Sequence, residues 1–178
     1  WALWIKIVIA CIPAAVLGLL FDDWMEAHLY NAYVVAATLI IYGVLFIALE
    51  NSSITANPSI TKVGHVSTKT ALFIGLFQLL SLVPGTSRSG STILGAMVLG
   101  CSRGVAAEFS FFLGIPVMFG ASFLKLVKFF VKGNVLTGPQ IFYTILGMAI
   151  AFGVSVYSIQ FLMGYVRRHD FKFFGYYR

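Results

Sequence analysis

The stretch VPGTSRSGST (83–92) lies between two short apolar runs, ALFIGLFQLLSL (71–82) and ILGAMVLG (93–100). It brings an arginine, several hydroxyls, a proline and two glycines into a chain that is 60% hydrophobic and only 10% charged. Such a composition is typical of polytopic membrane proteins. The stretch is therefore a polar, helix-breaking loop at a place where lipid is expected.

Neither flanking run reaches the length of about 20 residues that a membrane-spanning helix needs. Two short apolar segments around a polar break predict a re-entrant helix hairpin over 71–102, because irregular backbone at membrane depth is tolerated only where protein or a water-filled cavity surrounds it. Longer apolar runs predict spanning helices at about 4–21, 29–49, 105–124 and 140–166, and the segment 50–70 is predicted to be a polar loop. The predicted fold is one all-α membrane domain over 1–178.

The distribution of Lys and Arg supports the hairpin. If both ends of 71–102 lie on one side, seven basic residues share the cytoplasmic side, against three outside (Lys62, Lys69, Arg103, Arg167, Arg168, Lys172 and Arg178 against Lys125, Lys128 and Lys132). If 71–102 crosses once, the split becomes five against five. The positive-inside rule favours the first topology, which leaves the acidic segment 22–28 in an outer loop. The net charge of +6 is too diluted by apolar residues to suggest nucleic-acid binding.

The loop itself has the chemistry of an anion site. The guanidinium of Arg88 suits an oxyanion, above all phosphate, and an arginine at membrane depth needs a cavity and a partner. Gly85 and Gly90 allow the backbone to turn and to approach a ligand closely. The hydroxyls and the helix that begins near Ser91 add donors and a positive dipole end. The alternative is a polar turn in which a hydroxyl caps the helix and Arg88 pairs with a structural carboxylate.

Other polar residues leave two interpretations open. Gln78 lies at helical spacing from Gly75 and Ser81, so it either lines the cavity that holds Arg88 or makes a hydrogen bond between helices. Glu108 is either a structural partner of Arg88 or Arg103 or a residue near the site; the structural role is favoured, because a buried charge needs a partner. Cys11 and Cys101 lie in apolar surroundings and form no metal-ligand spacing, so both are expected to be packing residues.

Three quoted stretches carry a family resemblance: PGTSRSGST (84–92), GLFQLLSL (75–82) before it, and SRGVAAEFSFFLGIPVMFGAS (102–122) after it. Together with IPAAVLGLLF (12–21), they resemble the bacterial undecaprenyl-diphosphate phosphatase family of the bacitracin-resistance type. The resemblance implies a multi-pass enzyme of the bacterial inner (plasma) membrane. It would release phosphate from undecaprenyl diphosphate to give the carrier lipid for cell-wall peptidoglycan synthesis. It also implies an inverted-repeat fold and help from Mg²⁺ or Ca²⁺, with a homodimer as a further expectation.

The resemblance assigns roles to the loop. Arg88 and Ser87 would be catalytic, with Arg88 neutralising the diphosphate. The implied substrate-binding set, to which the polar edge of the first half-helix adds Gln78, is Gly85, Thr86, Ser89, Gly90, Thr92 and Gln78. The family's glutamate-rich motif with a histidine, which carries the metal ligands, acid–base groups and nucleophilic attack, is not found in these residues. The sequence therefore corresponds to the C-terminal two-thirds of such an enzyme, and we expect it to be inactive alone.

A transporter of an anionic lipid or a small anion is the competing hypothesis, because broken half-helices in an inverted repeat are transporter architecture. Another membrane phosphatase superfamily also uses a Ser-Arg pair, but it needs a histidine and an aspartate on one downstream helix. Here the first histidine after Arg88 is His169, which argues against that superfamily.

Overall fold

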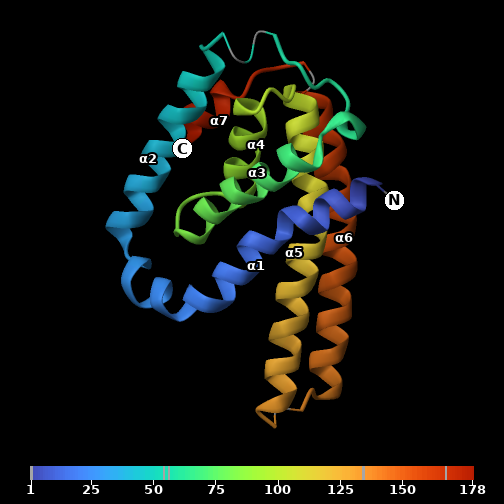
Figure 1. Cartoon of the computed structure of the whole chain (residues 1–178). Helices are drawn as coiled ribbons and strands as arrows, with labels where there is room; N and C mark the ends of the chain where they lie inside the picture. Colours follow the sequence, from blue (N-terminus) through green and yellow to red (C-terminus); the bar gives the residue numbers. More distant parts are fainter. Residues whose placement is uncertain (1, 54, 56, 134, 167) are drawn as a thin grey trace.

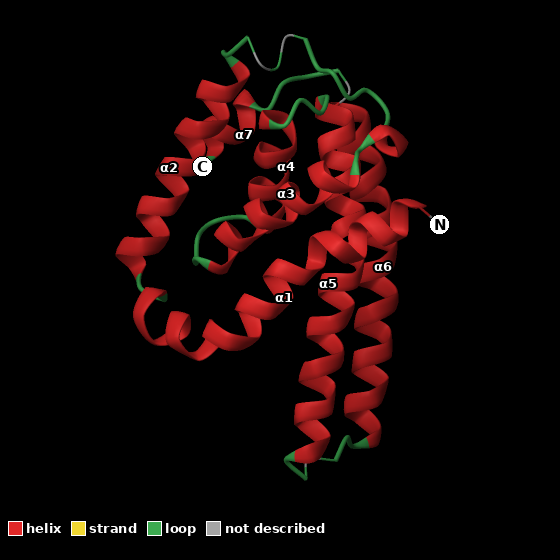
Figure 2. Cartoon of the chain, viewed as in Figure 1, coloured by secondary structure: helices red, strands yellow, loops and turns green. Residues whose placement is uncertain are grey.

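The protein is an all-α helical bundle. The computed structural model describes residues 2–53, 55, 57–133, 135–166 and 168–178, and only the backbone of Asp22, Asp23 and Glu26. Within this part the helices are α1 (Ala2–Leu29), α2 (Ala32–Glu50), α3 (Thr68–Gln78), α4 (Arg88–Val98), α5 (Arg103–Val131), α6 (Gly138–Val166) and α7 (Lys172–Tyr177) (Figures 1 and 2). Two short 3₁₀ turns, η1 (Val63–His65) and η2 (Leu79–Leu82), precede and follow α3.

Four helices are long and apolar enough to cross a membrane, and they confirm the polytopic prediction: Ala2–Phe21, Ala32–Glu50, Arg103–Val131 and Gly138–Val166. The last two pack as an antiparallel pair that extends beyond the rest of the molecule (Figure 1). None of the apolar window of α6 is buried by other parts of the described chain, so this helix presents its side chains to lipid or to further protein.

The segment between α2 and α5 folds as a pair of short helices. α3 and α4 pack on each other, and a single bridge joins the two ends of the pair: Ile60 accepts from the amide of Ser102 and donates to the carbonyl of Gly100. The chain therefore enters and leaves this hairpin side by side, as the sequence predicts for 71–102. Its insertion into a membrane as a re-entrant hairpin, and the inverted repeat, stay predictions.

The helices begin where a side-chain oxygen can accept from a backbone amide. Ser67 caps α3, Ser87 caps α4 and Ser102 caps α5, each accepting from the amide three residues later.

The apolar core forms where α3, α4 and the first half of α5 meet α1. Its fully buried side chains include Ile7, Ile74, Met97, Phe109 and Leu113. The core thus lies around the α3–α4 hairpin and holds its polar tip in place.

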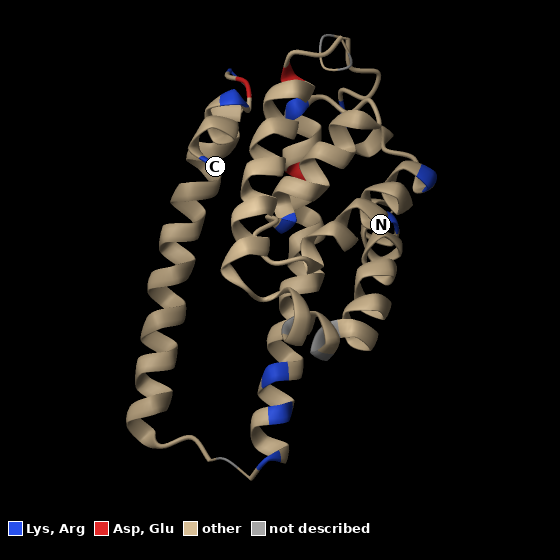
Figure 3. Ribbon diagram, turned by 90° about the vertical axis from the view of Figure 1, so that its left-hand side faces the viewer, with Lys and Arg blue, Asp and Glu red and all other residues tan. Residues whose placement is uncertain are grey.

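Two details of the predicted organisation are wrong. The segment 22–28, predicted as an outer loop, has helical backbone and continues α1 to Leu29. Lys125 and Lys128, also expected in a loop, belong to the last turns of α5, because that helix runs on to Val131. Figure 3 shows the basic residues of the last turns of α5 at the lower end of the molecule, far from most of the others. Arg167 lies outside the described residues, and the assignment of membrane sides stays a prediction.

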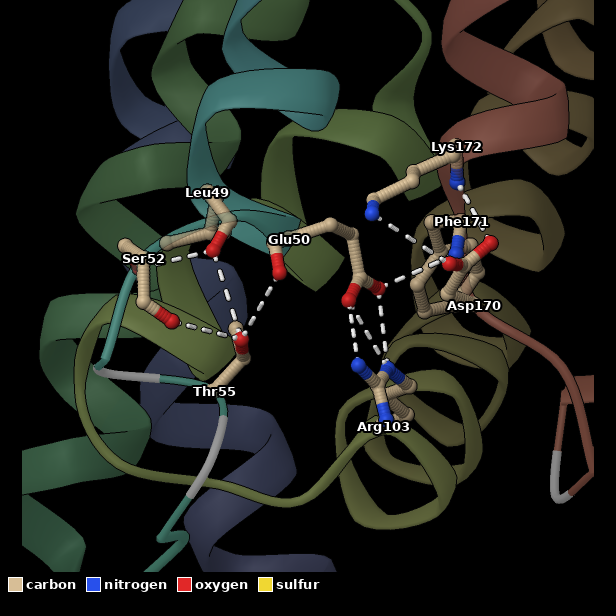
Figure 4. Close-up of polar contacts among 8 residues, drawn as sticks. All are labelled: Leu49, Glu50, Ser52, Thr55, Arg103, Asp170, Phe171 and Lys172. Atoms are coloured by element: carbon tan, nitrogen blue, oxygen red, sulfur yellow. Dashed lines mark hydrogen bonds and ion pairs between the residues drawn. The ribbon is translucent and has the colours of Figure 1, made fainter.

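A buried carboxylate joins three elements at the other end of the molecule (Figure 4). Glu50, the last residue of α2, accepts from Nε of Arg103 at 2.9 and 3.0 Å and forms an ion pair with Nη2 of the same arginine. It also accepts from the backbone amide of Phe171 at 3.0 Å. Because Phe171 directly precedes α7, this carboxylate fixes α7 and the start of α5 against the end of α2.

Candidate anion-binding site

The tip of the hairpin is a tight turn between η2 and α4 that packs against α2. Gly85 has φ of +87°, and a Cβ on this residue would overlap Thr38 and the backbone of Val35. The hydroxyl of Thr38 donates to the carbonyl of Pro84 at 2.8 Å. Glycine is therefore required here both for the left-handed conformation and for the close approach of the loop to α2.

The first turn of α4 follows this tip. Ser87 accepts from the amide of Gly90 at 3.1 Å, and the hydroxyl oxygens of Ser87 and Ser89 are 3.1 Å apart. The amides at the start of a helix and its dipole favour negative charge at this end. The helix begins at Arg88, three residues before the position expected from the sequence, so Ser87 is the capping residue.

Arg88 extends from this turn toward α5. Its guanidinium lies against Gly114, where a Cβ would be 2.6 Å from Nη2 and 2.9 Å from Nη1. Its Nη1 is buried and has no hydrogen-bond partner among the described residues. The side chain borders two cavities, of about 330 Å³ toward α1 and about 530 Å³ toward α6. A buried guanidinium donor without a partner, beside open volume, is the arrangement expected of an anion site.

Gln78 borders the smaller of these cavities together with Arg88. The residue is 2% exposed, and its Oε1 has no hydrogen-bond partner among the described residues. Of its two neighbours at helical spacing, Ser81 lines the same cavity, whereas Gly75 packs on the backbone of Ala10 in α1. Gln78 and Arg88 thus line the same cavity.

Two other predicted ligands have partners within the fold. The hydroxyl of Thr86 lies 2.7 Å from the carbonyl of Leu80 and 2.6 Å from that of Val83, so it closes the turn. Thr92 is 1% exposed, and its hydroxyl is 2.6 Å from that of Ser110 on α5. The contacts of Gly85, Thr86 and Thr92 position the loop. Contact of any of the predicted residues with a substrate stays a prediction.

Glu108 is not the ion-pair partner that the sequence suggested. The partner of Arg103 is Glu50, and Arg88 has no carboxylate partner among the described residues. Glu108 instead lies on the border of two cavities. One is the space of about 530 Å³ beside Arg88, and the other is a polar cavity of about 680 Å³ at the start of α5. The expectation failed because Glu50 lies at the end of an apolar run, where sequence alone predicted only a loop boundary.

Sequence reasoning also missed Gly114, which lies against the guanidinium of Arg88, and Arg178, which lies beside Gly90. A Cβ on Gly90 would be 3.5 Å from Nη2 of Arg178, the residue that follows α7. Gly114 had a signal, because it is a glycine inside a spanning helix close to the motif. Arg178 had none, since it lies 86 positions and two spanning helices after Thr92.

The described residues do not provide a metal site. No group of three or more His, Cys, Asp or Glu side chains lies together in the part of the chain that the structure describes. The two cavities beside Arg88 offer one carboxylate, that of Glu108, together with the positive charge of Arg88, which does not fit Mg²⁺ or Ca²⁺. A dependence on either ion therefore stays an expectation of the family resemblance.

Comparison with known proteins gives a consistent result. The family model described as "Bacitracin resistance protein BacA" matches residues 1–178. Three relatives named undecaprenyl-diphosphatase match all of the chain: those of Streptococcus mutans serotype c at 56% identity, Leuconostoc citreum at 54% and Enterococcus faecalis at 53%. The chain spans 63%, 63% and 64% of the lengths of these relatives, slightly less than two thirds.

Proposed function

Because the chain belongs to the bacitracin resistance protein BacA family, we propose that the protein containing it is a membrane hydrolase that releases phosphate from undecaprenyl diphosphate. Relatives that match the whole chain carry the name undecaprenyl-diphosphatase. The product would be the monophosphate carrier lipid of cell-wall synthesis, and the site of action the bacterial plasma membrane. The multi-pass fold suits a substrate whose prenyl chain lies in the bilayer.

One observation carries this proposal: Arg88, at the start of α4, has a buried Nη1 with no hydrogen-bond partner in the described part of the chain. A diphosphate placed there would accept from this guanidinium and from the free amides and hydroxyls of the first helical turn. As the bond between bridging oxygen and terminal phosphorus breaks, negative charge grows on the leaving oxygen. Fixed donors in a water-poor site stabilise that charge more than they stabilise the bound substrate.

The role proposed for these residues is binding and charge stabilisation. The family resemblance assigns the attack of water and the proton transfers to a motif that these 178 residues do not contain. We propose that this chain alone binds the lipid diphosphate without hydrolysing it.

The complete gene product, purified in detergent, provides the test. It should release inorganic phosphate from undecaprenyl diphosphate, and Arg88→Ala should lower kcat/KM by about a hundredfold to a thousandfold, the loss typical of a transition-state donor. Arg88→Lys should lose less. Lys128→Ala, in the last turn of α5, is the matched loss of a positive charge away from the site.

Activity of Arg88→Ala close to that of the unmutated protein would overturn the site assignment. If the protein moves the lipid across the bilayer of proteoliposomes without releasing phosphate, the competing hypothesis of a transporter would be favoured instead.

A further inference from the structure

A second arginine, Arg178, lies beside the first turn of α4; it follows α7, which packs on α2. Nη2 of Arg178 is 3.5 Å from the position of a Cβ on Gly90, and the same position is 3.4 Å from Oγ of Ser87. The guanidinium of Arg178 therefore faces the capping serine and the first turn of the helix. Like Arg88, this residue has a buried Nη1 without a hydrogen-bond partner among the described residues.

The position of Arg178 is fixed by the packing of α7 on α2. Gly43 and Gly175 cross so closely that a Cβ on either would be 2.9 Å from the carbonyl oxygen of the other. The guanidinium carbon of Arg178 is 5.9 Å from the ring centre of Tyr42 and 6.0 Å from that of Phe46. Contacts of this kind hold an arginine in place while leaving its N–H donors free for an anion.

Tyr42 also ties this cation to the hairpin. Its hydroxyl accepts from that of Ser91 at 2.8 Å, and Ser91 is 1% exposed in the first turn of α4. At the other end of α2, Glu50 accepts from the amide of Phe171, which precedes α7. Arg178 is therefore held on the same rigid unit as the start of α4.

We propose that Arg178 is a second substrate-binding cation, which holds the phosphoryl group that distinguishes a lipid diphosphate from a lipid monophosphate. This inference rests on the proposed function and adds a specificity determinant to it. Arg88 is the first residue of α4, and Arg178 reaches the first turn of the same helix from the end of α7. Each guanidinium can therefore take one phosphoryl group of the diphosphate. A lipid monophosphate has one such group and needs only Arg88.

Binding rather than turnover is the informative measurement. The probes are farnesyl methylenediphosphonate, a lipid diphosphate mimic that cannot be hydrolysed, and farnesyl monophosphate, each titrated into the complete gene product in detergent. Arg178→Ala should raise the Kd for the diphosphonate by about tenfold to a hundredfold, the range that a charge-assisted hydrogen bond supplies. The Kd for the monophosphate should change less than about twofold, well within the error of additivity for independent contacts.

Three further variants sharpen the result. Arg178→Gln keeps most of the side chain without its charge and should behave like Arg178→Ala, even if the alanine variant folds poorly. Arg178→Lys should bind the diphosphonate with intermediate affinity. Tyr177→Ala changes a neighbour that is 85% exposed and should leave both Kd values unchanged.

Equal weakening of both probes, or of neither, would overturn the inference. A lower unfolding temperature of Arg178→Gln with an unchanged ratio of the two Kd values would overturn it too, because it would limit Arg178 to its structural contacts with the rings of Tyr42 and Phe46. Selective loss of diphosphonate binding in a protein that releases no phosphate would support the inference while the proposed function fails. If neither probe binds the unmutated protein, both are overturned.

Discussion

The guanidinium of Arg88 and the bare backbone of Gly114 are in direct contact across the α4–α5 interface. A Cβ at Gly114 would be 2.6 Å from Nη2 of Arg88, so Gly114→Ala has to displace the guanidinium. The end of an arginine side chain can move at little expense, and the helix should still form. We expect the KM for the lipid diphosphate to rise by about tenfold, because a displaced charge-assisted hydrogen bond is lost or lengthened.

Gly120→Ala is the matched control for this prediction. It makes the same change on the same helix, at a position where nothing lies within 4 Å of the added Cβ. Steady-state phosphate release gives the KM, and thermal unfolding in detergent shows whether both variants fold. Equal KM values for the two alanine variants would contradict the assigned contact.

A second prediction concerns the stability of the buried carboxylate. The side chain of Glu50 is fully buried, whereas that of Arg103 is 37% exposed. Arg103→Met leaves the carboxylate buried without its cation and should destabilise the protein by about 3–5 kcal/mol. Asp170→Ala is the control: it removes the exposed ion pair between Asp170 and Lys172, whose charged atoms are 3.9 Å apart. It should change the stability by less than about 1 kcal/mol.

The double variant Glu50→Leu with Arg103→Met separates charge from packing. Replacement of both partners by apolar side chains should recover most of the loss, apart from the bond to the amide of Phe171. The unfolding midpoint in detergent is the readout. A double variant that is as unstable as Arg103→Met would show that the ion pair itself stabilises the fold.

The spanning helices and the hairpin could be predicted from the sequence because each is encoded locally. Apolar run length separates the four spans from the short helices α3 and α4, and the polar break marks the tip. The end of α1 was misplaced because the acidic segment 22–28 resembles a loop in composition while its backbone stays helical. Composition reports the membrane environment better than it reports where a helix ends.

In the candidate site too, the residues of the local motif could be identified from the sequence, whereas residues brought together by packing could not. Arg88 and Ser87 could be found because they belong to one short motif with a recognisable donor chemistry. Glu50 and Arg178 could not be assigned from the sequence. Glu50 pairs with Arg103, 53 residues further along, and Arg178 lies beside Gly90, 88 residues before it. Both contacts depend on how α2, α5 and α7 pack. For the same reason, the sequence pointed to Glu108 as the partner of an arginine, whereas the structure shows that Glu50 pairs with Arg103.

A third prediction uses the ionisation of Cys101. Burial raises the pKa of this thiol from 9.0 to about 11, and the residue is 4% exposed. Only the thiolate reacts with iodoacetamide, so the fraction available at pH 8 is about a hundredfold lower than for a free thiol. In a Cys11→Ala variant, alkylation should be slow at pH 8 and should rise steadily up to about pH 11. Mass spectrometry gives the rate. In the same protein unfolded in detergent, the rate should reach half of its maximum near pH 9. Identical pH profiles for the folded and unfolded protein would contradict the assigned burial.

The last prediction concerns the paired hydroxyls of Thr92 and Ser110, which are 2.6 Å apart and almost fully buried. Thr92→Val leaves the hydroxyl of Ser110 without this partner and should destabilise the protein by about 1–3 kcal/mol, the penalty for an unsatisfied buried group. Combining it with Ser110→Ala removes both hydroxyls and should restore most of that loss. Because the pair joins α4 to α5 and neither residue lines the two cavities beside Arg88, the double variant should also keep the KM of the unmutated protein within about twofold. A large rise in KM at normal stability would instead support the direct contact of Thr92 with the diphosphate that the sequence predicts.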